Sequence, residues 1–281
     1  MTQTPKAVPR RKGARRMAEI PPAVLNALNE GRDETVTLVE WLAIDIRILA
    51  RAMAGQIGAA GARETLGRAA DALADQSISA RTKGMGAALR GWLAERNDRD
   101  ALAARLAAHG SDTVRMWTCY ARVGEAGLGL KERLARGKPF AADRAMSVRE
   151  SAWDALRPFL AENLSRAFKL LERWVRDRDP NVRRCAVEGT RPRGVWCAHL
   201  AELRKDPDPG LALLEPLRAD PHRYVQTSVA NWLNDASKDH PDWVRKVAAR
   251  WLKESKADAT RWIANHATRT LRKRGAVRSG C

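Results

Sequence analysis

The sequence has 281 residues, and its hydrophobic content of 44% is sufficient for a folded core. Its 51 Lys and Arg residues outnumber 33 Asp and Glu residues, so the formal net charge is +18. This charge favours a polyanionic partner such as nucleic acid, with a membrane surface or an acidic protein as alternatives. No apolar run of about 18 residues occurs, which excludes a transmembrane helix.

The N-terminal segment is basic and lacks the apolar region of a secretory signal. We therefore predict a disordered basic arm over residues 1–18 and a cytoplasmic, nucleoid-associated protein. The chain that follows is predicted to form one domain over residues 19–274, and residues 275–281 are predicted to be a flexible tail.

The first hundred residues show helical patterns without a clear repeat. Residues 34–53 and 83–109 have helical periodicity, and we expect them to cap the N-terminal end of the fold. The glycines of residues 123–130 are typical of a loop that connects two helices.

One segment recurs five times in the rest of the chain. Small or apolar residues follow its aligned apolar position at helical spacing, which predicts the inner helix of a helical pair in every copy. The spacings between the copies are 34, 34, 43 and 38 residues. The aligned apolar residues are Val114, Val148, Val182, Val225 and Ile263.

Between the copies lie second helices and Asp-Pro turns. Residues 166–177 and 242–255 are amphipathic, and Asp-Pro pairs at 177–181, 205–210 and 219–222 are typical of helix starts. A helix pair of roughly 35–45 residues that begins with Asp-Pro-x-Val-Arg resembles the HEAT repeat. The predicted fold is all-α, a HEAT-like-repeat α-solenoid in which antiparallel helix pairs form a curved right-handed superhelix.

Metal and cofactor chemistry find no support in the sequence. The four cysteines form no Cys-x-x-Cys pair and none lies at metal spacing from a histidine, so we expect reduced thiols in the core. No P-loop and no strand-borne GxGxxG is present. We predict no metal and no cofactor, and the repeat alone would fit a protein-binding scaffold.

Three stretches carry a family resemblance. EGTRPRGVW (188–196), SVANWLNDASKDHPDWV (228–244) and LRPFL (156–160) resemble segments of the AlkC-type DNA alkylation repair proteins, HEAT-like-repeat glycosylases related to AlkD. The resemblance covers about 147–273. It implies a concave basic surface that holds damaged DNA and the removal of N3-alkylated bases, chiefly 3-methyladenine. The implied partner is double-stranded DNA carrying alkylated bases, bound by a monomer.

The resemblance also implies a catalytic aspartate. Asp235 lies in the matching segment, beyond the inner helix SVANWL, and is the candidate by position; Asp239 is the fallback. A carboxylate there could stabilise the positive charge that develops on the sugar and orient a water molecule. Alternatively, Asp235 is a turn residue that contacts Lys238.

One position departs from the family pattern. Where the AlkC pattern has a glutamate, four residues before the arginine of the Arg-Pro-Phe run, this chain has Trp153. Glu150 lies nearly one turn upstream and Asp154 is adjacent, so Glu150 is the candidate for a second catalytic carboxylate. Otherwise the second acid is lost and the site is degenerate.

The stretch EGTRPR predicts a cationic corner between helices. Pro192 breaks the helix, so the arginines on either side can reach phosphate oxygens from a non-helical segment. Alternatively, Arg191 pairs with Glu188 or caps a helix. Tryptophans near such a corner can stack on a base or a sugar, although most tryptophans of a helical repeat lie in the core. The candidate DNA-binding cations are Arg157, Arg191, Arg193 and Lys238, and the candidate stacking residues are Trp153, Trp196 and Trp232.

Two hypotheses follow from the sequence. One is a monofunctional DNA glycosylase for cationic alkylated bases, and the other is a non-catalytic scaffold that binds nucleic acid or an acidic protein. The enzyme hypothesis expects an open Asp235 carboxylate between exposed Trp and Arg side chains. The scaffold hypothesis expects buried aromatic residues and a paired Asp235.

Overall fold

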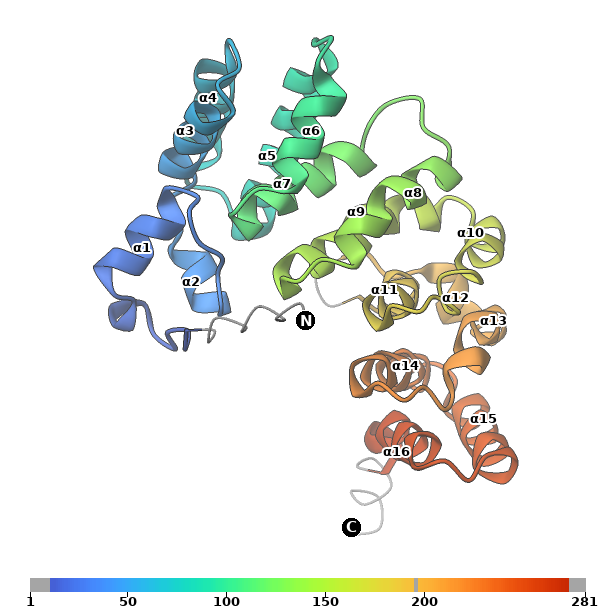
Figure 1. Ribbon diagram of the computed structural model, residues 1–281. Helices are drawn as coiled ribbons and strands as arrows, with labels where there is room; N and C mark the ends of the chain where they lie inside the picture. Colours follow the sequence, from blue (N-terminus) through green and yellow to red (C-terminus); the bar gives the residue numbers. More distant parts are fainter. Residues whose placement is uncertain (1–10, 195–196, 273–281) are drawn as a thin grey trace, which may run out of the picture. The chain divides into compact units, whose positions relative to one another are not determined.

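The computed structural model describes residues 11–194 and 197–272, and these ranges are helical without strands (Figure 1). They form two compact units whose boundary lies between Gly124 and Glu125. Within the described ranges no helix is long and apolar enough to cross a membrane. Of the predicted arm, residues 1–10 lie outside the described residues, as does the predicted tail. A single domain over residues 19–274 stays a prediction.

The N-terminal unit is built on α3, α4, α5 and α7, which pack in that order along the chain. The predicted helical segment 34–53 forms two helices because the Asp45 side chain accepts a hydrogen bond from the Arg47 backbone N–H and so begins a new helix. Arg11, from the predicted arm, pairs with Asp33 and Glu40. The elements are η1 (Met17–Glu19), α1 (Pro22–Asn29), α2 (Leu38–Ala43), α3 (Ile46–Ile57), α4 (Ala62–Leu73), α5 (Ile78–Ala94), α6 (Arg99–Ala107) and α7 (Asp112–Val123).

The C-terminal unit is a stack of helices in two layers. In the inner layer α9 packs on α11, α11 on α14 and α14 on α16, while α8, α10, α13 and α15 pack on the outer side. The elements are α8 (Leu130–Ala141), α9 (Met146–Ala161), α10 (Leu164–Leu171), α11 (Pro180–Gly189), α12 (Ala201–Lys205), η2 (Asp208–Gly210), α13 (Leu211–Leu214), η3 (Glu215–Leu217), α14 (Arg223–Ala236), α15 (Pro241–Glu254) and α16 (Asp258–Ala267).

The five-fold repeat is confirmed by burial. The aligned apolar residues lie in α7, α9, α11, α14 and α16, and each is at most 1% exposed. The loop predicted over residues 123–130 is also confirmed, since α7 ends at Val123 and α8 begins at Leu130. Gly127 has φ +75° in this loop, a conformation that strongly favours glycine.

In four of the five copies the residue after the repeated valine is polar and ties the inner helix to the turn before it. In three copies an arginine Nη1 donates to the carbonyl oxygen six residues earlier, at 2.8 Å: Arg115, Arg149 and Arg183. In the fourth copy the side-chain amide of Gln226 makes the same bond to the Asp220 carbonyl, also at 2.8 Å. The repeated Val-Arg pair therefore has a structural cause, because turn carbonyls near the core need a donor.

The longest repeat spacing contains a non-helical segment. After α11 the described residues 190–194 and 197–200 form no helix, in agreement with the predicted break at Pro192. Thr190 begins the segment, and its hydroxyl bonds back to the Ala186 carbonyl at 3.0 Å. The described residues 190–194 and 197–200 are called the corner segment below.

Candidate functional site

A cavity of about 300 Å³ lies among α9, α11, α14 and the start of the corner segment. Its wall is mixed, with acidic, basic, aromatic and amide side chains, as a site for a polar ligand with an aromatic part would be. Among the residues that line it are Glu150, Trp153, Arg184, Glu188, Arg191, Ser228 and Asn231.

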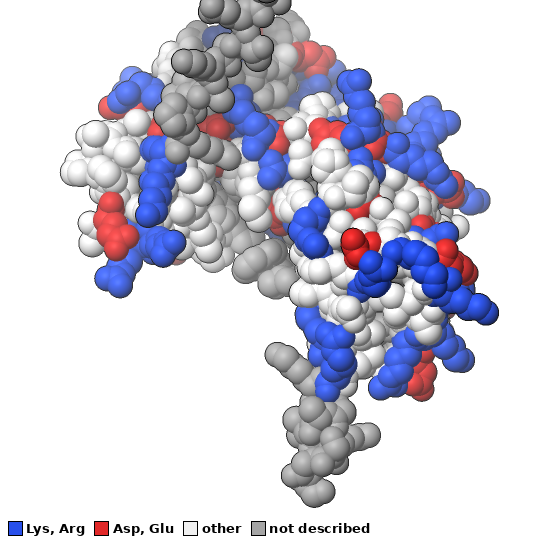
Figure 2. Space-filling view, turned by 60° about the horizontal axis from the view of Figure 1, so that its bottom comes forward, with Lys and Arg blue, Asp and Glu red and all other residues white. Residues whose placement is uncertain are grey.

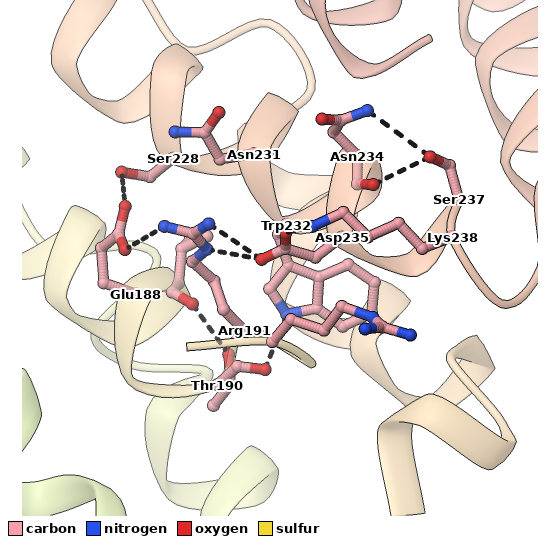
Figure 3. A network of polar contacts seen from close by, with 12 residues as sticks. Glu188, Thr190, Arg191, Ser228, Asn231, Trp232, Asn234, Asp235, Ser237 and Lys238 are labelled. Atoms are coloured by element: carbon pink, nitrogen blue, oxygen red, sulfur yellow. Dashed lines mark hydrogen bonds and ion pairs between the residues drawn. The ribbon is translucent and has the colours of Figure 1, made fainter. Parts of the chain in front are cut away.

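Glu188 is the most buried carboxylate of the cavity wall. The residue is 5% exposed and lies on the last turn of α11. Its Oε1 accepts a hydrogen bond from the Ser228 hydroxyl at 2.6 Å, and its Oε2 pairs with Arg191 Nη1 at 3.1 Å (Figure 3). Arg184 Nη2 lies 3.6 Å from Oε1. The site thus holds a buried negative charge that is fixed by partners from two repeats.

Asp235 is buried and paired. Its Oδ2 lies 2.8 Å from Arg191 Nη2 and 2.9 Å from Arg191 Nε, and its Oδ1 lies 3.1 Å from Lys238 Nζ (Figure 3). The side chain is 6% exposed and joins the cavity through Arg191 rather than lining it. The open carboxylate of the enzyme hypothesis is therefore not observed, and the pairing is that of the scaffold hypothesis.

Arg191 bridges the two carboxylates. Burial lowers the pKa of its guanidinium group, but Glu188 and Asp235 outweigh this effect, and the net shift of the pKa is upward. Arg191 therefore stays cationic and is directed into the protein between α11 and α14. The predicted contact of Arg191 with phosphate would require it to leave one of these partners.

Glu150 and Trp153 approach each other on α9. The indole Nε1–H of Trp153 donates to Glu150 Oε2 at 2.9 Å, and Glu150 Oε1 pairs with Arg184 at 2.7 Å. Trp153 is 4% exposed. Both residues line the cavity, so the structure brings the predicted second carboxylate to the same wall as Glu188.

The buried Arg157 side chain binds backbone carbonyls at the corner segment. Its guanidinium group donates to the carbonyl oxygens of Gly189, Arg191 and Ala198 at 2.9–3.2 Å, and the residue is 3% exposed. Burial lowers its pKa. These bonds satisfy the carbonyl of the last residue of α11 and two carbonyls of the corner segment, so the position of Arg157 gives its predicted contact with DNA no support.

Trp232 is a core residue. It is fully buried, its Nε1–H donates to the Thr190 carbonyl at 2.9 Å, and its ring lies against Gly210. A Cβ at Gly210 would come within 2.3 Å of the ring, so only glycine fits there. Stacking of Trp232 on a base finds no support in this burial, and Trp196 lies outside the described residues.

Arg193 and Asp239 fix the far side of the corner segment. Arg193 Nη2 lies 2.6 Å from Asp239 Oδ1, and Arg204 Nε lies 3.0 Å from Asp239 Oδ2. The hydrogen bonds from Arg204, and then those from Arg193, lower the pKa of Asp239 to about 2. Asp239 is thus engaged by two arginines, and Arg193 reaches phosphate only by giving up this pair.

The Asp239 pairs predict a specific pH dependence. A carboxyl whose pKa falls from 3.8 to about 2 on folding adds stability above pH 4, and this contribution disappears as the pH falls through about 2. We expect the difference in free energy of unfolding between the wild type and Asp239→Asn to be constant above pH 4 and to shrink toward pH 2. Urea unfolding across this range measures it, and a difference that does not change with pH would contradict the assignment.

Repeat register identifies the cavity residues that the sequence reasoning missed. Residues two and six positions after the aligned valine lie one helical turn apart on the same face. In α9, α11 and α14 five of these six positions carry polar side chains that line the cavity: Glu150, Arg184, Glu188, Thr227 and Asn231. A comparison of polar positions across the copies finds Glu188, which the family resemblance alone does not single out.

Basic side chains are widely distributed on the surface. In Figure 2 lysines and arginines are spread over the visible face, with aspartates and glutamates between them. Many exposed arginines pair with acidic neighbours, as Arg245 does with Asp242. The basic excess is thus partly neutralised locally, and its concentration on one face stays a prediction.

Comparison with known proteins gives three findings. Residues 139–271 match the family described as "DNA alkylation repair enzyme". The chain is similar to the Pseudomonas fluorescens alkylpurine DNA glycosylase AlkC, solved bound to DNA containing an abasic site analog. The TM-score is 0.67 at 32% identity, covering 79% of this chain and 61% of that chain. It is also 45% identical to YhaZ of Bacillus subtilis (strain 168) over 93 residues, 33% of this chain and 26% of that protein. The chain thus spans less than two thirds of either relative.

Proposed function

We propose that this chain is a DNA alkylation repair protein and that it acts as a DNA glycosylase for N3-alkylated, cationic bases such as 3-methyladenine. The match of residues 139–271 to the DNA alkylation repair enzyme family and the similarity to AlkC support this proposal. The observation that carries this proposal is the cavity at α11, where Glu188 lines the wall and Arg191 joins it to Asp235. A buried carboxylate in the cavity wall and a second one joined to it through Arg191 are suited to stabilise positive charge on a sugar.

The chemistry requires little acid catalysis. When the bond between C1′ and the base nitrogen breaks, its electron pair neutralises the cationic base, which leaves as a neutral molecule. The sugar then carries oxocarbenium character, and a nearby carboxylate lowers its energy. Water adds to C1′ and releases a proton, which a carboxylate can accept. In this proposal Glu188 and Asp235 provide the negative charge, and the product is an abasic site.

DNA binding and the ion pairs are linked in this proposal. Arg191 and Lys238 both hold Asp235, and phosphate oxygens are alternative partners for the same cations. When phosphates draw these cations away, Asp235 loses partners and its charge becomes available to the sugar. The substrate would be duplex DNA of the nucleoid, in the cytoplasm.

Lys238 is the better mutational test of the phosphate contacts, since its side chain is 37% exposed. Each lost phosphate contact reduces the slope of log K against log salt by about one. We expect Lys238→Ala to reduce the slope by about this amount in a duplex-binding titration, and the exposed Lys246 of α15 provides the control. An unchanged slope for Lys238→Ala would show that Lys238 makes no phosphate contact.

The test of the function is direct. The protein is incubated with DNA treated with a methylating agent, and the released bases are identified by mass spectrometry. Release of 3-methyladenine above the spontaneous rate supports the proposal. Binding to this DNA without release of any alkylated base would overturn it.

A second candidate function is a non-catalytic scaffold that binds nucleic acid or an acidic protein. The observation that favours it is the pairing of Asp235 with Arg191 and Lys238, together with the burial of Trp232. A scaffold could bind its partner without any change in the ion pairs of Asp235. The base-release experiment separates the two candidates, because only the glycosylase produces free base.

A further inference from the structure

We infer that Glu150 provides a third carboxylate to the cavity and that Trp153 is the positioning residue that holds it there. The inference rests on the proposed glycosylase function and deepens it. It also gives the tryptophan at position 153 a role other than stacking on a base.

Both oxygens of Glu150 have a partner in the cavity wall. Oε2 accepts the Trp153 indole N–H at 2.9 Å, and Oε1 pairs with Arg184 at 2.7 Å. A carboxylate held at both oxygens has lost most of its rotamer freedom, so its negative charge stays in one position. The Glu150 side chain nevertheless remains 30% exposed and can face a ligand.

The tryptophan is rigid enough to position its neighbour. Trp153 is 4% exposed, and its Cβ lies within 3.8 Å of the Cβ position that a side chain at Gly189 would have. Residues three apart on a helix share a face, which places the indole directly beside Glu150. A phenylalanine would fill most of this space but could not donate the hydrogen bond.

Arg184 connects the third carboxylate to the first. Its Nη1 pairs with Glu150 and its Nη2 lies 3.6 Å from Glu188, while its guanidinium group stacks 4.2 Å from the Tyr224 ring. Burial lowers the pKa of Arg184, but Glu150 and Glu188 outweigh it and the pKa is raised. Glu150 and Glu188 therefore share one fixed cation, and both carboxylates are held in fixed positions at the wall of the cavity.

The experiment is a double-mutant cycle on base release under single-turnover and steady-state conditions. We expect Glu150→Gln to lower kcat by about 10- to 100-fold, because a preorganised charge is lost. Trp153→Phe should lower kcat by about tenfold with little change in KM, because Glu150 is kept but no longer held. If Trp153 acts through Glu150, the double variant should be no slower than Glu150→Gln alone.

Trp243→Phe is the matched control. Trp243 also donates its indole N–H to a carboxylate, Asp208, at 3.1 Å, but neither residue lines the cavity. We expect this variant to release base at the wild-type rate, and thermal unfolding shows whether the four variants are folded to the same extent as the wild type.

Three outcomes overturn the inference. They are wild-type activity in Glu150→Gln, wild-type activity in Trp153→Phe, and an equal effect of Trp153→Phe in both backgrounds, which would mean that the ring acts independently of Glu150. A wild-type protein that releases no base refutes the proposed function instead, so the two failures are distinguishable.

Discussion

Asp235→Asn should lower the rate of base release by about 100- to 1000-fold, the cost of removing one preorganised charged or polar group from a reaction site. The amide has nearly the same shape as the carboxylate, and Arg191 keeps its pair with Glu188, so the fold is expected to survive. Affinity for intact duplex DNA should stay the same or rise slightly, because a negative charge near the phosphates is removed. Single-turnover release of 3-methyladenine measures the effect.

Two further variants make this result specific. Glu188→Gln removes the other buried carboxylate and should also lower the rate strongly. Asp239→Asn removes a carboxylate that is paired with Arg193 and Arg204 outside the cavity and should retain most activity. Wild-type release rates in both Asp235→Asn and Glu188→Gln would show that these carboxylates serve only the ion pairs of the fold.

Asp220→Asn should destabilise the C-terminal unit by about 3–5 kcal/mol, the usual cost of breaking a buried ion pair on one side. Arg183 Nε and Nη2 donate to the two Asp220 oxygens at 2.7 and 3.1 Å, and both side chains are at most 10% exposed. Asp220 also accepts from the His222 backbone N–H at the start of α14. The substitution leaves the Arg183 charge buried without a counter-charge. Denaturant unfolding, followed by circular dichroism, measures the loss.

An exposed pair of the same chemistry provides the control. Arg245 and Asp242 lie on α15, with side chains 57% and 82% exposed. Solvent screens such pairs, so Asp242→Asn should change the free energy of unfolding by less than about 1 kcal/mol. If Asp220→Asn lowers the free energy of unfolding as little as Asp242→Asn does, the Arg183–Asp220 pair does not stabilise the C-terminal unit.

The sequence by itself determined the helices and their repeat, because helical periodicity and capping are local. The spacing of apolar residues around Val182 and Val225 identifies two inner helices. The ring of Pro192 and its missing N–H prevent α11 from continuing. The repeated Val-Arg pair likewise bonds to a turn only five or six residues away. The position of Glu150 one turn before Trp153 was also readable, since residues three apart on a helix share a face.

Only the tertiary structure decided which charges pair. The sequence allowed Arg191 either to face phosphate or to pair with Glu188. It does pair with Glu188, and the packing of α11 on α14 also brings it to Asp235, which is 44 residues away in the chain. Arg157 in the same way reaches carbonyls 32–41 residues away. An arginine has the same charge on a surface or between two helices. Its partner depends on packing between repeats, which local sequence patterns do not encode.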